Sequence, residues 1–320
     1  MEGRNLNQMR KLSIFILIIF CLTNLQLNGQ SFTELNSEIN GTVYKSLDFR
    51  SEILDTGFSY TIYLPPYYHT THDSLPVLYL LHGYGGDENS WIARCNIHRI
   101  IDSLINTGEI PPVIVIMPDG RNSYYINDYQ FRFPYEDIIV TELIPYIDST
   151  YRTISQKRCR LIAGLSMGGY GAIVLSIKHP DIFGECISLS AAIRTDEMII
   201  NAKSADYNKK FSTLFGGELQ GEERISEHWK AYSPFYLVDD STSDKLKSVN
   251  WYFNCGMNDF LIQGSEALHR LYLKWEIPHE YHVRIGSHNW EYWKTGIIEG
   301  IKFAGQRISE SDIKTSRTYF

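Results

Sequence analysis

A short stretch centred on Ser166 constrains the fold of this chain more than any other. The apolar, β-rich run 161–165 leads into Gly164-Leu165-Ser166-Met167-Gly168, and a helical pattern follows. Side chains at the two flanking glycines would collide with the neighbouring strand and helix, and the serine itself needs strained backbone. The N–H groups that open the following helix favour negative charge beside the serine. The stretch therefore predicts a nucleophile elbow, Gly-x-Ser-x-Gly, and not merely a glycine-rich turn without chemistry.

Segments of strand and helix character alternate along most of the chain. Strand-like runs occupy 42–49, 58–64, 76–81, 112–117, 161–165, 185–190, 249–254 and 280–285. Helical spacing occupies 91–105, 134–151, 167–179, 261–275 and 290–303. Continuous apolar strands alternating with helices are typical of an α/β protein with a parallel sheet. We therefore expect a mostly parallel, eight-stranded sheet flanked by helices.

A polar, aromatic-spotted insertion of about 194–248 interrupts this alternation after the sixth strand. Long insertions beside a catalytic sheet edge commonly form part of a cap, although a separately packed surface excursion has the same composition. We see no repeats, low-complexity tracts or linkers in the sequence. The chain therefore predicts one domain over 31–305 with a cap-like insertion, followed by a polar C-terminal tail over 306–320.

Residues 1–30 have the order of a secretory signal peptide. Positive charges come first, the apolar run 12–22 follows, and 24–31 is polar. The alternative is a transmembrane anchor, but the run is well short of the ~20 residues that a helix needs to cross a bilayer. We expect cleavage near Gly29 or Gln30, a secreted or periplasmic protein, and no stable membrane anchor after cleavage.

Charge and cysteine content exclude several other classes. The net charge of −7, without clustered Lys and Arg, argues against a nucleic-acid partner. The four cysteines that follow the leader lack the paired spacing of a metal site, and buried thiols are the expected state. They are Cys95, Cys159, Cys186 and Cys255. We predict no metal and no cofactor.

A serine hydroxyl is a poor nucleophile and needs a base that an acid holds in place. With a nucleophile elbow, the acid and then the histidine are expected to follow the serine along the chain. Asp259 lies directly after the strand ending at Cys255, and His288 lies directly after the strand ending at Ile285. Because parallel strands end at the same sheet edge, the side chains of Ser166, Asp259 and His288 are predicted to converge.

The oxyanion of such a reaction needs two backbone N–H donors. One is expected from Met167, directly after the serine, and the other from the loop after the third strand. That loop reads His82-Gly83-Tyr84-Gly85, where we favour the Tyr84 N–H and keep Gly85 as the alternative.

Aromatic residues near the predicted cleft are candidates for substrate contacts. Tyr124 and Tyr125 begin an aromatic loop that continues to Phe133, and Trp290 closely follows His288. Sugar or phenolic rings could stack on such side chains. The alternative is that the loop packs its aromatic rings against the protein body.

Taken together, several motifs resemble those of the putative esterase (esterase D) family of α/β-hydrolases, over about residues 42–303. They are Leu80-Leu81-His82-Gly83-Tyr84-Gly85-Gly86 with Trp91, Met117-Pro118-Asp119-Gly120, Gly164-Leu165-Ser166-Met167-Gly168-Gly169, Cys255-Gly256 with Asp259, and Gly286-Ser287-His288-Asn289-Trp290. The resemblance implies the α/β-hydrolase fold, a triad of Ser166, Asp259 and His288, and acyl-ester chemistry. The family includes feruloyl and acetylxylan esterases, S-formylglutathione hydrolases, siderophore esterases and mycolyltransferases, so the resemblance does not fix the substrate.

These observations predict a secreted serine carboxylic ester hydrolase that works through an acyl-enzyme. An exported protein fits feruloyl or acetyl esters of plant polysaccharide better than a cytosolic thioester. The alternatives are a siderophore or other small-ester esterase and an acyltransferase, which shares every catalytic residue. A carbohydrate-binding relic of the fold is the non-enzymatic alternative.

Overall fold

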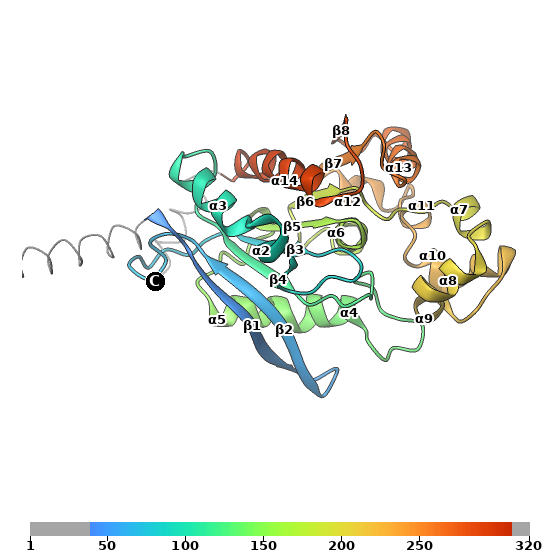
Figure 1. The fold of residues 1–320 in the computed structure, drawn as a ribbon, viewed down its shortest axis with the longest axis horizontal. Helices are drawn as coiled ribbons and strands as arrows, with labels where there is room; N and C mark the ends of the chain where they lie inside the picture. The colour runs from blue at the N-terminus through green and yellow to red at the C-terminus, as the bar shows by residue number, and fades with distance from the viewer. Residues whose placement is uncertain (1–38, 309–320) are drawn as a thin grey trace, which may run out of the picture.

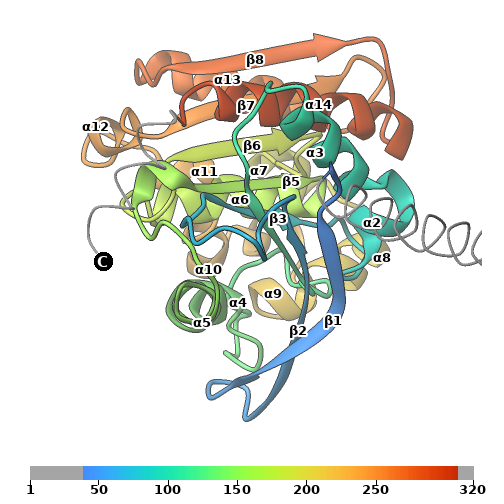
Figure 2. The same ribbon diagram turned by 90° about the vertical axis from the view of Figure 1, so that its left-hand side faces the viewer.

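A computed structural model of the protein describes residues 39–308 (Figure 1). The predicted signal peptide, 1–30, and all but the first residues of the predicted tail, 306–320, lie outside the described residues. The described part is built around one eight-stranded sheet with helices on both faces (Figure 2). Among these helices none is long and apolar enough to cross a membrane.

The strand order of the sheet is β1-β2-β4-β3-β5-β6-β7-β8. The antiparallel hairpin of β1 and β2 forms one edge and pairs antiparallel with β4, while all strand pairs from β4 to β8 are parallel. The strands are β1 (Thr42–Ser51), β2 (Thr56–Leu64), β3 (Val77–Leu81), β4 (Ile114–Pro118), β5 (Arg160–Leu165), β6 (Glu185–Leu189), β7 (Asn250–Gly256) and β8 (His279–Arg284). The predicted mostly parallel sheet is confirmed.

Helices bury an apolar layer against each face of the sheet. The strands β3, β4, β5 and β6 are buried along their whole length, which explains their continuous apolar sequences. One layer is covered by α2 (Ser90–Cys95), α3 (Ile97–Asn106) and α14 (Trp290–Gly305). The other layer is covered by α4 (Tyr135–Asp137), the π-helical η1 (Ile138–Leu143), α5 (Ile144–Thr150), α6 (Met167–Lys178) and α13 (Ile262–Lys274).

Two predicted helices are subdivided in the structure. The segment 91–105 forms α2 and α3, separated at Asn96, whose φ of 51° is left-handed. Asparagine tolerates this conformation better than most residues, so the chain can turn there. The segment 134–151 is continuous but contains the π-helical turn η1 between α4 and α5.

The insertion lies between β6 and β7 and consists of short helices. They are α7 (Asp196–Ile200), α8 (Ser204–Lys210), α9 (Ser212–Phe215), η3 (Gly221–Arg224), α10 (Glu227–Lys230), α11 (Pro234–Leu237) and α12 (Ser243–Leu246). Most of them gather at one end of the molecule, on the right in Figure 1. Arg194 and Lys210 from this insertion line the same cleft as Ser166, which places part of the insertion beside the predicted site.

Candidate active site

Ser166 stands at a sharp turn between β5 and α6. Its backbone angles, φ 53° and ψ −114°, are unusual for a residue with a side chain and are typical of strained functional turns. A Cβ on Gly164 would lie 2.3 Å from the Gly168 carbonyl oxygen, and one on Gly168 would lie 2.5 Å from the Leu81 oxygen. Both flanking positions therefore require glycine, as the Gly-x-Ser-x-Gly spacing predicts.

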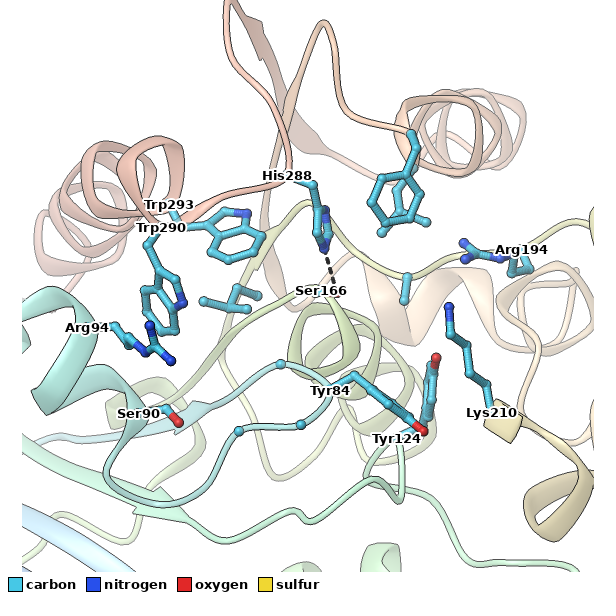
Figure 3. Close-up of a pocket in the computed structure, with 17 residues that line it drawn as sticks. Tyr84, Ser90, Arg94, Tyr124, Ser166, Arg194, Lys210, His288, Trp290 and Trp293 are labelled. Atoms are coloured by element: carbon cyan, nitrogen blue, oxygen red, sulfur yellow. Dashed lines mark hydrogen bonds between the residues drawn. The ribbon is translucent and has the colours of Figure 1, made fainter. Parts of the chain in front are cut away.

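The structure brings Ser166, His288 and Asp259 together (Figure 3). His288 Nε2 lies 2.9 Å from Ser166 Oγ, and His288 Nδ1 lies 2.9 Å from Asp259 Oδ2 and 3.1 Å from Oδ1. With Nδ1–H donating to the carboxylate, Nε2 is left as an acceptor for the serine hydroxyl. The three side chains come from the carboxyl ends of β5, β7 and β8, where the sequence predicts them.

The environment of Asp259 keeps it ionised. Burial alone would raise the pKa of this carboxyl, but hydrogen bonds from His288 and from the Leu261 N–H outweigh that effect and hold its pKa below the ordinary value. The Leu261 N–H lies 2.9 Å from Asp259 Oδ1. The buried carboxylate can therefore orient His288 and stabilise positive charge on its ring.

The Tyr84 and Gly85 N–H groups, the two candidate oxyanion donors in the loop after β3, differ in their hydrogen bonds. The Gly85 N–H donates to Asn122 Oδ1 at 2.7 Å and is thereby engaged. Within residues 39–308, neither the Tyr84 N–H nor the Met167 N–H has an acceptor. Met167 opens α6, where N–H groups have no partner inside the helix. The arrangement favours Tyr84 over Gly85 as the second oxyanion donor.

His82 holds the loop after β3 in place. Its buried ring accepts a hydrogen bond from the Gly120 N–H at Nε2 (2.8 Å) and donates from Nδ1 to the Gly83 oxygen (2.8 Å). These partners join the loop after β3 to the loop after β4. Sequence reasoning did not single out His82, although a polar residue directly after a fully buried strand was the available signal.

The predicted substrate contact by Tyr125 is wrong. This side chain is 0% exposed, and its hydroxyl accepts the His82 N–H at 2.9 Å, beneath the loop. Its ring also fills the space above Gly120 and Gly171, where a Cβ would lie within 3 Å of it. Tyr125 therefore supports the loop after β3 and does not contact substrate. The alternative interpretation, that the aromatic loop packs its rings against the protein body, is correct for Tyr125.

A cleft of about 320 Å³ opens beside Ser166 and His288 (Figure 3). Tyr84, Tyr124 and Trp290 line it, as does the exposed ring of Phe260. Of the predicted contacts, Trp290 is partly exposed in this cleft, whereas Tyr124 borders it with a side chain that is only 4% exposed. The remaining aromatic residues of the loop, Tyr129, Phe131 and Phe133, are exposed and are not among the residues that line the cleft.

Three positively charged side chains also line the cleft, and the sequence did not predict them. They are Arg94 on α2, Arg194 after β6 and Lys210 at the end of α8. No sequence pattern links them, because they come from separate segments that only the fold brings together. Within residues 39–308, no group of three or more His, Cys, Asp or Glu side chains is placed to hold a metal.

The fold and the Ser166–His288–Asp259 arrangement define the α/β-hydrolase class. Residues 51–304 match the model of the family described as "Putative esterase". The chain belongs to this family and is thus an enzyme of the esterase type. The predicted family membership is confirmed.

Relatives and solved structures agree with this assignment. The chain is 33% identical over 189 residues to an endo-1,4-beta-xylanase/feruloyl esterase of Xylanibacter ruminicola, covering 56% of this chain and 26% of that protein. It is 27% identical over 238 residues to an acetyl esterase of Caldicellulosiruptor saccharolyticus, covering 72% of this chain and 84% of that protein. A solved ferulic acid esterase superposes with a TM-score of 0.72 at 28% identity, covering 84% of this chain and 99% of its own. The chain spans about a quarter of the first relative and most of the second.

Proposed function

We propose that this protein is a serine carboxylic ester hydrolase that works through an acyl-enzyme. The observation that carries the proposal is the 2.9 Å contact between Ser166 Oγ and His288 Nε2, with Asp259 on the other ring nitrogen. A hydroxyl held against an oriented imidazole, at the mouth of a cleft, is the arrangement that acyl transfer requires.

The reaction follows from this geometry. His288 Nε2 takes the Ser166 proton as Oγ bonds to the ester carbonyl carbon, and the N–H groups of Tyr84 and Met167 hold the oxyanion. Collapse breaks the bond to the alcohol oxygen, which leaves with the proton from His288. A water molecule then gives a proton to His288 and attacks the acyl carbon, which releases the carboxylic acid and returns the proton to Ser166 Oγ.

Feruloyl or acetyl esters of plant polysaccharide are the proposed substrates. The relatives named feruloyl esterase and acetyl esterase support this class of ester. The ring of Trp290 supports it further, because this partly exposed ring lines the cleft and could pack against a phenolic or sugar ring. A secreted or periplasmic location belongs to the same proposal and is supported by the charged, apolar, polar order of residues 1–30.

Ser166→Ala tests the proposal with p-nitrophenyl acetate, methyl ferulate and acetylated xylan as substrates. The variant should keep its fold by circular dichroism and lose reaction with a fluorophosphonate probe and nearly all turnover. Ser149→Ala is the matched control, because Ser149 lies on α5, exposed, and its hydroxyl bonds only the Tyr146 carbonyl within the described chain. Full turnover by the Ser166→Ala protein would contradict the proposal, and the relative rates on the three substrates identify the ester class.

A further inference from the structure

The cleft beside Ser166 is lined by cations without any acidic side chain. Arg94, Arg194 and Lys210 are its charged lining residues, and none of the described residues that line it is Asp or Glu. Within residues 39–308, no carboxylate lies within ion-pair distance of these three cations. The protein has a net charge of −7, so the positive charge of this cleft is opposite in sign to the charge of the whole protein.

Arg194 and Lys210 are the less exposed of these three cations, because Arg94 is exposed and the other two are half-buried. Both come from the insertion, are half-buried, and extend toward one another beside Tyr84 and Tyr124 (Figure 3). Arg194 donates only to its neighbour, the Ile193 carbonyl, at 3.4 Å within the described chain. Burial lowers the pKa of its guanidinium, although Tyr124 and Asp259 act in the opposite direction. Two cations that line one partly desolvated cleft favour the binding of an anion between them.

Buried arginines elsewhere in the protein do have partners. Arg160 bonds Asp148 Oδ2 at 2.7 Å, and Arg224 donates to the carbonyls of Ile199, Ala202 and Leu219. Neither of these two arginines needs a ligand to provide a partner for its charge. Arg194 and Lys210 instead line a substrate-sized cleft, as Arg94 also does.

We propose that the cleft selects esters that carry a carboxylate, and that Arg194 and Lys210 bind this carboxylate. The inference rests on the proposed ester hydrolase function and specifies its substrate class. A guanidinium and an ammonium on one side of the cleft can share a carboxylate through charge-assisted hydrogen bonds. On a polysaccharide, such a group is the carboxylate of a uronic acid unit near the ester.

The carboxylate could belong to the acyl part or to the alcohol part of the ester, and two substrate pairs distinguish them. The acyl pair is p-nitrophenyl hydrogen adipate and its methyl ester, followed by p-nitrophenol release. The alcohol pair is 4-acetoxybenzoate and methyl 4-acetoxybenzoate, followed by acetate release. Each pair differs in one negative charge, and the ratio of kcat/KM within a pair measures the preference for that charge.

The wild-type protein should prefer the charged member of one pair, and the preference should fall as NaCl is raised. The double variant Arg194→Gln/Lys210→Met should lower that ratio about ten- to hundredfold, mostly through KM, as loss of hydrogen bonds to a charged group predicts. Lys210→Met alone should lower the same kcat/KM ratio several-fold. This single variant tests the proposal if the double variant fails to fold.

Lys209→Met is the matched control. Its exposed side chain is not among the lining residues, and only its backbone carbonyl meets the Tyr84 hydroxyl, at 3.4 Å. The charge preference should not change in this variant. Turnover that depends on Ser166 without preference in either pair, or a preference that Lys210→Met leaves intact, would overturn the inference alone. Turnover that survives Ser166→Ala would overturn the proposed function instead.

Discussion

Asn122 Oδ1 accepts a hydrogen bond from the Gly85 N–H at 2.7 Å and so ties the loop after β3 to the loop after β4. Gly85 has a left-handed φ of 76°, which suits glycine, and its N–H is engaged by this contact. The preceding N–H, that of Tyr84, has no acceptor within residues 39–308 and is the donor that we propose for the oxyanion. The position of one side-chain amide thus determines which backbone donor the site can use.

Asn122→Ala should lower kcat about tenfold with little change in KM. The Gly85 N–H loses its acceptor, the loop is held less firmly, and a donor that acts mainly in the transition state is misplaced. Asn122→Asp keeps an acceptor at the same place and should retain most of the activity. Steady-state kinetics with p-nitrophenyl acetate measures both, and an Asn122→Ala enzyme with wild-type kcat would count against this account.

Asp259→Asn should lower kcat by roughly 10³ to 10⁴-fold while the protein stays folded. An amide in place of the carboxylate can donate to the ring nitrogen and favours the tautomer in which Nε2 no longer accepts the Ser166 proton. Binding of a non-reactive substrate analogue, measured by calorimetry, should be nearly unchanged. A fall confined to KM would show that Asp259 acts in binding and does not orient His288.

Much of the fold could be predicted because it rests on local signals. Continuous apolar runs mark strands buried on both faces, and the glycines around Ser166 mark a turn where side chains do not fit. Because parallel strands end at one edge, the sequence positions of Asp259 and His288 were enough to predict that they meet. Family membership then agrees with an arrangement already expected from the residues.

The lining of the cleft could not be predicted in the same way. Arg94, Arg194 and Lys210 lie on segments whose meeting depends on how the insertion packs, and no period in the sequence encodes that packing. Tyr124 and Tyr125 are neighbours with the same side chain and both are buried, yet only Tyr124 is among the residues that border the cleft. Both have positive φ, so regular alternation does not apply to them.

Tyr125→Phe and Tyr124→Phe form a matched pair of variants. Their stabilities distinguish a tyrosine that supports the loop after β3 from one that borders the cleft. Removing the Tyr125 hydroxyl leaves the buried His82 N–H without its acceptor and should lower the free energy of unfolding by about 1–3 kcal/mol. The Tyr124 hydroxyl has no hydrogen-bond partner within residues 39–308, so its removal should change stability by less than about 1 kcal/mol. Urea unfolding measures both, and equal losses would contradict the assignment of Tyr125 as the supporting residue.

Glu185→Gln should stabilise the protein increasingly as pH rises from 5 to 8. Burial raises the pKa of Glu185 to about 8, although the Asn250 amide, at 2.7 Å, and the charge of Arg307 act in the opposite direction. A raised folded pKa means that the folded protein holds a proton that the unfolded chain loses near pH 4.5, so stability falls between these values. Glutamine has no such proton, and the gain should reach roughly 2–4 kcal/mol at pH 8. Urea unfolding at several pH values checks this, and a constant difference would contradict it.

Glu136→Gln should have the opposite effect on stability from Glu185→Gln, because the pKa of Glu136 is lowered in the folded protein. Burial alone would raise the pKa of Glu136, but His179 at 2.8 Å and Lys178 at 2.7 Å outweigh it and hold the pKa at about 2. A lowered folded pKa contributes stability above pH 4.5, and this contribution is lost as pH falls toward 2. The variant should therefore be less stable by about 3 kcal/mol at pH 5, and the loss should shrink below pH 4. If the loss did not shrink between pH 4 and pH 2, the ion pairs of Glu136 would not be its cause.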